Sequence, residues 1–439
     1  MLSKSVTGSK REPTDKAAMT IKSQSMKTAW LVVFLLAPVA LLNYLDRQML
    51  ASMKFSVMSD IKDIGNDTQW GIMLAQFKWV YALCSPIGGF LADRYSRRWI
   101  ICGSLFAWSA ITWWTGHADS YHTLLWTRTA MGVSEAFYIP AALALIVDYH
   151  VGASKSRAVG IHTAAIYVGI IIGGFAGLVA DEPSLGWRFA FSVTGALGVL
   201  YSLPLLYFLR DARTNHTTNS ELTAHLPNNE QKSIISLKSL ITNPSFLLLA
   251  LYFTLVAMPG WMMKDWMPSM LKDQFNISQG KAGVSAGLYV NLAGFVGLFI
   301  GGYCSDRWVR RHLRGRTFVS AIGMATLIPA LYGLGHSQNL SVAIVFLALF
   351  GLGFGLYDCN NMPILSQLVR PEIRATGYGI MNFLSVSVGG FADIGVGKLK
   401  DQGASFETIL GMGAILVAIN VFLILQVKPK TELTPELEQ

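Results

Sequence analysis

Charged residues are scarce in this sequence. Asp, Glu, Lys and Arg together make up 14% of the 439 residues, whereas 52% are hydrophobic. A soluble domain ordinarily carries about a quarter charged residues, so the composition excludes a soluble globular protein and predicts an integral membrane protein. The formal net charge of +9 does not indicate nucleic-acid binding, because the basic residues lie mostly in the short segments between apolar stretches.

Residues that carry enzyme chemistry are also few. The four cysteines lie within apolar stretches at unpaired spacings, so neither a disulfide framework nor a zinc site is predicted. The sequence has no phosphate-binding glycine loop and no clustered nucleophile and base. We therefore expect no cofactor, no metal site and no enzymatic activity. A receptor would usually add a soluble signalling domain, and the longest polar interruption, 210–243, is too short for one.

Long apolar stretches are what the sequence has in abundance. Each is near or above the ~20 residues that a helix needs to cross the ~30 Å hydrocarbon core of a bilayer. They run over about 29–54, 69–92, 99–117, 121–149, 157–180, 187–209, 244–271, 283–305, 317–336, 340–366, 374–398 and 404–427. This pattern predicts an all-α integral membrane protein with twelve transmembrane helices. The expected parts are a disordered tail (1–26), a six-helix bundle (27–209), a linker (210–243), a second six-helix bundle (244–427) and a second tail (428–439).

Lysine and arginine predict the orientation, because cytoplasmic loops are enriched in them. They are concentrated in the two tails and in the loops on the same side, whereas the opposite loops hold few: Lys62, Arg188, Lys272, Lys281, Lys398 and Lys400. Both termini are therefore expected in the cytoplasm. The short tails and the lack of added domains favour a bacterial inner membrane, with a eukaryotic organelle as the alternative. The protein is expected to be a monomer.

Two sequence patterns recur in the second half. The stretch 89–98, GFLADRYSRR, follows the second apolar span, and 302–311, GYCSDRWVRR, follows the eighth. RAVG at 157–160 opens the fifth span, and RATG at 374–377 opens the eleventh. Matching motifs at matching places predict two pseudo-symmetric halves that arose by duplication.

These motifs resemble those of the major facilitator superfamily over residues 27–427. The resemblance implies secondary transport by alternating access, in which the two halves rock about a central site. It also implies that the loop motif latches one conformational state rather than contacting substrate. The residues expected to form this latch are Gly89, Asp93, Arg94, Arg97, Arg98, Asp306 and Arg307.

Two further motifs point to branches of this superfamily. Arg128-x-x-x-Gly132-x-Ser134-Glu135-Ala136 resembles a motif tied to proton coupling. Together with Asn43-Tyr44-Leu45-Asp46-Arg47, it is similar to the anion:cation symporters, which implies proton-coupled symport of a sugar acid such as a hexuronate, an aldonate or a sialic acid. Spinster-like lysolipid transporters share a similar Asp-Arg pair and Glu-Ala motif, and they form the alternative. The direction of transport and the choice between proton and sodium stay open.

Charged residues inside apolar spans mark the expected site. A charge near the bilayer centre costs roughly 2.5–3.5 kcal/mol even on lenient scales, so such residues face one another or a water-filled path. Glu135 and Asp46 are the expected proton-coupling residues, because a carboxylate that is paired in one state and exposed in another changes its proton affinity. The alternative is that both form permanent ion pairs with Arg47 and Arg128.

Cations and hydrogen-bonding side chains make up the expected substrate site. Guanidinium and ammonium groups attract an anion, and arginine can hold a carboxylate with two hydrogen bonds. The expected substrate-binding residues are Arg47, Arg128, Lys78, Lys264, Tyr44, Tyr81, His162, Asn360, Asn361 and Asn382. For the uncharged ones, hydrogen bonding between helices is an equally good interpretation. Asp358 and Asp393 either pair with Lys264 or form a second coupling site.

Overall fold

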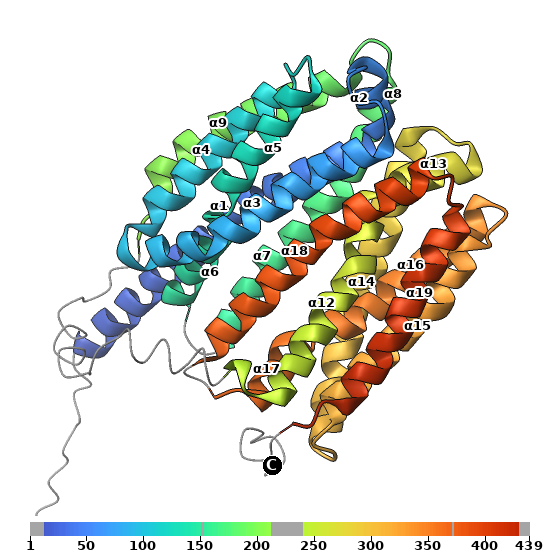
Figure 1. The fold of residues 1–439 in the computed structure, drawn as a ribbon. Coiled ribbons are helices and arrows are strands. Elements are labelled where there is room, and N and C mark those ends of the chain that lie inside the picture. The colour runs from blue at the N-terminus through green and yellow to red at the C-terminus, as the bar shows by residue number, and fades with distance from the viewer. Residues whose placement is uncertain (1–12, 151–152, 212–239, 371–372, 430–439) are drawn as a thin grey trace, which may run out of the picture.

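The computed structural model describes residues 13–150, 153–211, 240–370 and 373–429, which form helices and short connections without a β-strand (Figure 1). The first half contains α1 (Pro13–Ser52), α2 (Lys54–Asp60), α3 (Asp67–Arg94), α4 (Arg97–Thr115), α5 (Tyr121–Glu135), α6 (Tyr138–Tyr149), α7 (Ala153–Gly174), α8 (Ala176–Asp181) and α9 (Gly186–Phe208). The second half contains α12 (Pro244–Asp265), α13 (Met267–Phe275), α14 (Gln279–Val309), α15 (Gly315–Gly335), α16 (Leu340–Asp358), α17 (Asn361–Leu368), α18 (Arg374–Asp401) and α19 (Phe406–Gln426).

The expected fold class is confirmed. Every one of the predicted apolar spans is a helix or two consecutive helices, and ten of them are long and apolar enough to cross a membrane by length and composition. The other two, α3 and α4, are helices of 28 and 19 residues. Most interrupted spans have a proline in the first turn of the second helix, namely Pro140, Pro268 and Pro363. Proline lacks the amide hydrogen that would continue the preceding helix, but it fits a first turn.

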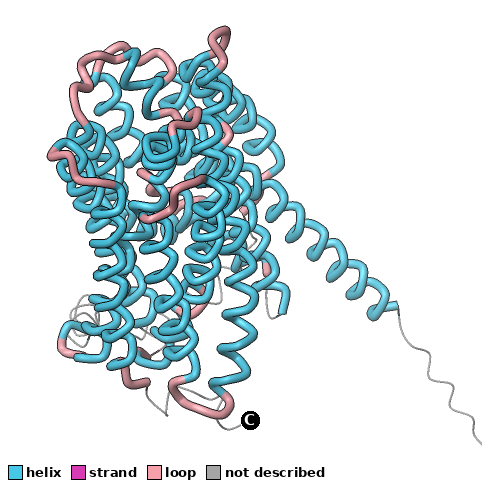
Figure 2. Tube along the Cα trace, turned by 90° about the vertical axis from the view of Figure 1, so that its right-hand side faces the viewer, coloured by secondary structure: helices cyan, strands magenta, loops and turns pink. Residues whose placement is uncertain are grey.

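The amino-terminal tail differs from the expectation. Helix α1 begins at Pro13, so helical structure extends into the segment 1–26 that was expected to be disordered, and the helix projects away from the bundle (Figure 2). The cause is the absence of any helix-breaking residue between Pro13 and the first apolar span. Residues 1–12, 212–239 and 430–439 lie outside the described residues, so the expectations for the rest of the tails and for the linker stay predictions.

Glycines bring the two halves into backbone contact at one end of the molecule. This is the end that carries α2, α8 and α13 (Figure 1), hereafter the α2–α13 end. A Cβ atom at Gly71 of α3 would lie 2.5 Å from the carbonyl oxygen of Asp393 in α18, and one at Gly174 of α7 would lie 2.7 Å from that of Gly283 in α14. At Gly89 and Gly379, in the parts of α3 and α18 near the other end, a Cβ would meet nothing within 4 Å. Small residues allow this close approach of membrane helices.

Two carboxylates hold the same end across the halves. Asp401 of α18 accepts hydrogen bonds from the backbone amides of Asp67 and Thr68, each at 2.9 Å, at the start of α3. Asp181 of α8 accepts one from the amide of Gly280 at 2.8 Å, at the start of α14. The first amides of a helix lack partners within it and carry a partial positive charge, so a carboxylate stabilises them. Helices α3 and α14 hold corresponding places in the two halves, so these contacts follow the internal symmetry.

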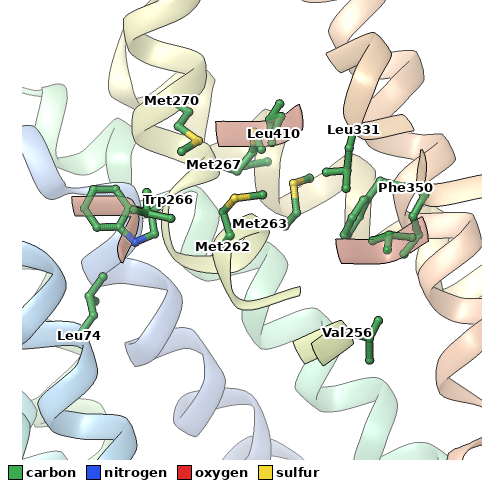
Figure 3. Packing of buried hydrophobic residues seen from close by; sticks show 14 of the residues in the cluster. Leu74, Val256, Met262, Met263, Trp266, Met267, Met270, Leu331, Phe350 and Leu410 are labelled. Atoms are coloured by element: carbon green, nitrogen blue, oxygen red, sulfur yellow. The ribbon is translucent and has the colours of Figure 1, made fainter. Parts of the chain in front are cut away.

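The largest cluster of buried apolar side chains also crosses between the halves. It contains Leu74 of α3 and the α12–α13 residues Met262, Met263, Trp266 and Met267 (Figure 3). A second cluster, around Trp108 and Tyr138, lies within the first half. The halves are therefore packed together at the α2–α13 end by apolar side chains as well as by glycines and carboxylates.

Enlarging Gly174 tests this packing. We expect Gly174→Leu to push α14 away from α7, because overpacking a tight contact costs about 1–3 kcal/mol. Spin labels at Ser184 and Gln338, which are exposed in loops of opposite halves at this end, should move apart in a pulsed electron resonance measurement. Gly103→Leu is the matched control, since a Cβ there meets nothing within 4 Å, and it should leave the label distance unchanged. An unchanged distance in Gly174→Leu would contradict the packing described.

Candidate functional site

A cavity of about 370 Å³ lies between the halves, with walls from α1, α3, α7, α12, α14, α16 and α18. Its lining is chemically divided. Polar side chains include Tyr44, Arg47, Tyr81, Lys264, Asn291, Asp358, Tyr378 and Asn382, whereas apolar ones include Ile166, Ile170, Phe253, Val256, Phe350 and Phe354. The cavity can therefore surround a ligand that has a charged part and an apolar part.

The Arg47 side chain dominates the polar wall. Its Nε donates to Oε2 of Glu135 at 2.7 Å, and its Nη2 lies 2.6 Å from the same oxygen. The rings of Tyr44, Phe77 and Tyr81 surround the guanidinium, with their centroids 4.8–4.9 Å from its central carbon. Glu135 is fully buried, whereas 15% of the Arg47 side chain is exposed. Arginine thus presents a charge to the cavity while its counter-ion stays behind it.

Asp46 lies on the other side of the same turn and faces the interior of the first half. Its Oδ2 accepts a hydrogen bond from Thr112 at 2.6 Å. Arg128 donates to the Thr115 hydroxyl at 3.2 Å and interacts electrostatically with both Asp46 and Glu135. Consecutive residues on a helix diverge by about 100°, which is why Arg47 reaches the cavity and Asp46 does not. The four charges form a balanced group of two carboxylates and two guanidinium groups.

Lys264 and Asp358 provide charge on the wall of the second half. Both line the cavity and attract each other electrostatically. Asn361 donates to the Asp358 carboxylate at 3.1 Å, and Gln48 of α1 donates to the Lys264 carbonyl at 3.3 Å. The second half therefore contributes one cation and one carboxylate directly to the cavity.

Lys78 lies outside the cavity lining, although it was expected to bind substrate. Its ammonium group forms ion pairs with Asp265 and with Asp393, the latter at 2.5 Å. The ring of Trp261 lines the cavity and lies 4.3 Å from the Lys78 nitrogen. Lys78 therefore binds two carboxylates of the opposite half and contacts Trp261, a residue of the cavity lining.

Four other expected substrate residues also lie outside the lining. His162 and Asn360 are buried. The His162 ring hydrogen-bonds the Tyr138 hydroxyl at 3.0 Å, and Asn360, at the start of α17, donates to the carbonyl of Leu356 in α16. As described above, Arg128 interacts with Asp46 and Glu135, and Asn361 donates a hydrogen bond to Asp358. The lining contains Tyr44, Arg47, Tyr81, Lys264 and Asn382 of the expected set. The interpretation of His162 and Asn360 as helix-packing residues fits this structure.

Comparison with known proteins identifies the family. The family model described as Major Facilitator Superfamily matches residues 36–392. The chain belongs to the Major Facilitator Superfamily. It is accordingly a multi-pass membrane transporter and not an enzyme.

Relatives of this transporter include several spinster proteins. Protein spinster of Drosophila melanogaster is 30% identical over 372 residues, which are 83% of this chain and 60% of that protein. Protein spinster homolog 1 of Homo sapiens is 30% identical over 86% of this chain and 74% of that protein. An MFS-type efflux pump of Mycolicibacterium smegmatis is 29% identical over 86% of this chain and 85% of that protein. The chain thus spans somewhat less than two thirds of the Drosophila protein.

Solved structures agree on the fold. A bacterial homolog of the human lysosomal transporter spinster, in an inward-facing and occupied conformation, superposes with a TM-score of 0.75 at 20% identity, covering 90% of this chain and 96% of that one. A D-xylose-proton symporter gives a TM-score of 0.70 at 14% identity, covering 91% and 98%. At these identities the likeness shows the shared fold of the superfamily and no more.

The superfamily loop motif makes its described contacts within its own half. Arg97 pairs with Asp148 of α6, and Arg98 donates to the carbonyl of Leu206 in α9 at 3.1 Å. In the second half Asp306 pairs with Arg316 at 3.4 Å. Arg94 and Arg307 are exposed, and a Cβ at Gly89 would meet nothing within 4 Å. The Asp93 side chain lies outside the described residues, so its role as a latch stays a prediction.

Sequence reasoning did not single out two participants of the site. Asp265 is not among the residues expected at the site, yet it pairs with Lys78 of the other half. Thr112 carries no charge and follows no motif, yet it binds Asp46. The available signal for Asp265 was an acidic residue inside an apolar span, whereas nothing in the sequence marks Thr112.

The placement of His162 leads to a paired test. We expect His162→Asn to lower thermal stability, because losing a buried hydrogen bond costs about 0.5–1.5 kcal/mol, and to leave the KM for transport unchanged. Asn382→Ala removes a group from the cavity lining and should raise the KM instead. Thermal unfolding in detergent and uptake into proteoliposomes separate the two effects. A raised KM in His162→Asn at normal stability would contradict the placement.

Proposed function

We propose that this transporter carries an anionic amphiphile of the lysophospholipid type, coupled to protons, by alternating access. The observation that carries the proposal is the divided cavity: the Arg47 guanidinium and Lys264 lie on walls that also contain Phe253, Val256 and Phe350. A guanidinium binds phosphate or carboxylate oxygens with two parallel hydrogen bonds. The apolar side chains provide a place for an acyl chain. The similarity to spinster proteins supports this class over a small polar substrate.

Arg47 connects substrate binding to proton binding. In this structure Glu135 neutralises Arg47 from behind the cavity wall. A proton on Glu135 would cancel that attraction and leave the guanidinium free for the anionic headgroup. Asp46 and Arg128 lie beside the pair of Arg47 and Glu135. The four side chains together therefore carry no net charge once Glu135 has lost its proton. Proton and substrate thereby bind as one unit, which is the requirement for coupling.

The proposed orientation makes this an inward-facing state. Cytoplasmic termini follow from the distribution of lysine and arginine, and the halves are packed together at the α2–α13 end, which is then the external one. We propose a monomer in a bacterial inner membrane. The loop motif would latch the opposite, outward-facing state, since the described contacts of Arg97 and Arg98 lie within their own half.

Sugar-acid symport is the second candidate. The observation in its favour is the number of hydroxyl and amide groups in the lining: Tyr44, Tyr81, Tyr378, Asn291 and Asn382. These groups can form hydrogen bonds with the hydroxyl groups of a sugar acid, and Arg47 can bind its carboxylate. Both candidates share the anionic group and the proton, and they differ in the apolar part of the substrate.

Glu135→Gln tests the coupling. The variant cannot bind or release a proton at this position, so we expect proton-driven accumulation to fall to background while exchange of labelled substrate across the membrane continues. Glu182→Gln is the control, because Glu182 is exposed in a loop, and it should accumulate substrate normally. Accumulation by Glu135→Gln under an imposed proton gradient would show that Glu135 is not the proton carrier.

A substrate panel separates the two candidates. Proteoliposomes with an inward proton gradient would be offered a labelled lysophospholipid, a panel of sugar acids and their neutral sugars, with and without an ionophore. We expect movement of the lysolipid that the ionophore abolishes, and its loss in Arg47→Ala. Uptake of a sugar acid without its neutral counterpart, and no lysolipid movement, would instead establish the second candidate.

A further inference from the structure

The group formed by Lys78, Asp265 and Asp393 has one cation and two carboxylates. Lys78 comes from α3 in the first half, whereas Asp265 comes from α12 and Asp393 from α18 in the second half. The exposed fractions of their side chains are 3%, 14% and 0%. With both carboxylates ionised, this group would carry a net charge of −1 in a place with little water. Uncompensated buried charge is costly, and binding a proton removes it.

Among the described residues, Lys78 is the only cation that forms an ion pair with either carboxylate. Helix α12 has two charged residues, Asp265 itself and Lys264. Lys264 attracts Asp265 electrostatically, but its strongest electrostatic partner is Asp358 at the cavity, so this second pair adds no net charge. The other charges of α3 lie at its ends: Asp67 binds Lys54 and Lys400, while Asp93 and Arg94 are at the far end. On α18 itself, Lys398, Lys400 and Asp401 lie more than a turn away, and Arg374 is at the opposite end. The described helix α17 carries no charged residue.

One oxygen of Asp393 is open to a proton. Oδ2 accepts the Lys78 ammonium, whereas Oδ1 is buried and accepts no hydrogen bond of ordinary geometry from any described residue. The Trp266 indole faces this carboxylate without completing such a bond. A buried, charged oxygen that accepts no hydrogen bond is unfavourable. A proton bound at Oδ1 would remove the negative charge from this oxygen.

The position of the group connects it to the opening of the α2–α13 end. The Asp393 carbonyl is the atom that Gly71 of α3 packs against. Helices α12 and α18 both belong to the second half, so any separation of α3 from these two helices at this end pulls Lys78 away from both carboxylates. Once separated, Asp265 and Asp393 gain water, which stabilises two ionised carboxylates without a counter-ion. The closed arrangement favours one bound proton, and the open arrangement favours none.

We infer that Asp393, together with Asp265, forms a second proton-binding site at the α2–α13 end, in which one bound proton favours closure of that end. This site is distinct from Glu135, which lies in the first half behind Arg47. The inference rests on the proposed proton coupling only for its role in transport. The effect of pH on closure stands without any substrate.

The test measures closure directly. Spin labels at Ser184 and Gln338 are attached to the full chain in nanodiscs, after Cys84, Cys102, Cys304 and Cys359 have been replaced by serine. Distance distributions between the labels are recorded from pH 5 to pH 9 without substrate. The parent is the labelled protein without further substitutions. In it we expect the ratio of short to long distances to rise as pH falls, by at most about tenfold per pH unit, which is the limit for linkage to one proton.

Asp393→Asn should give short distances at every pH, because it mimics the protonated residue. Asp265→Asn provides a second variant with the same expectation if the first does not fold.

Glu135→Gln should keep the pH dependence of the parent, so that failure of the proposed coupling at Glu135 is distinguished from failure of the inference about Asp393. Asp63→Asn, at an exposed loop residue, should also behave as the parent. A parent whose distances do not change with pH, or a pH dependence that persists in both Asp393→Asn and Asp265→Asn, would overturn the inference.

Discussion

The ion pair between Arg47 and Glu135 is the interaction on which the rest of the structure depends. Neither charge is tolerable alone in the middle of a membrane helix bundle. Pairing them across α1 and α5 fixes the two helices relative to each other and leaves one face of the guanidinium toward the cavity. The three surrounding aromatic rings exclude water from the pair while favouring the cation. The molecule therefore contains a paired cation that still lines the cavity.

Charge balance then distinguishes two regions of the interior. Around Arg47 there are two carboxylates and two guanidinium groups, so this group is neutral without a proton. At Lys78 there are two carboxylates and one ammonium group, contributed by both halves. A neutral group inside one half can respond to a substrate, whereas an unbalanced group between the halves responds to their separation. In the mechanism we propose, substrate recognition and conformational change are assigned to different charged groups.

The contacts at the α2–α13 end are of several kinds, and all of them are reversible. Glycine packing gives close approach without interlocking side chains, and the carboxylates of Asp181 and Asp401 bind helix amides that water can also satisfy. None of these contacts needs the backbone of either half to change. Two rigid bundles that separate at one end and close at the other are the expected consequence.

The sequence by itself determined the helices, the six-plus-six division and the presence of a charged site. Apolar runs must be helical in a bilayer because their backbone groups have no other partner there. The charges at Asp46, Arg47, Arg128 and Glu135 must find partners because isolation is too costly.

Which partner each charge takes was decided by the tertiary structure. Lys78 and Lys264 look alike in sequence, as cations within apolar spans, yet one binds Asp265 and Asp393 and the other lines the cavity. Their difference depends on how α3 packs against α18, and that distance is set by glycines such as Gly71, whose neighbours lie hundreds of residues away.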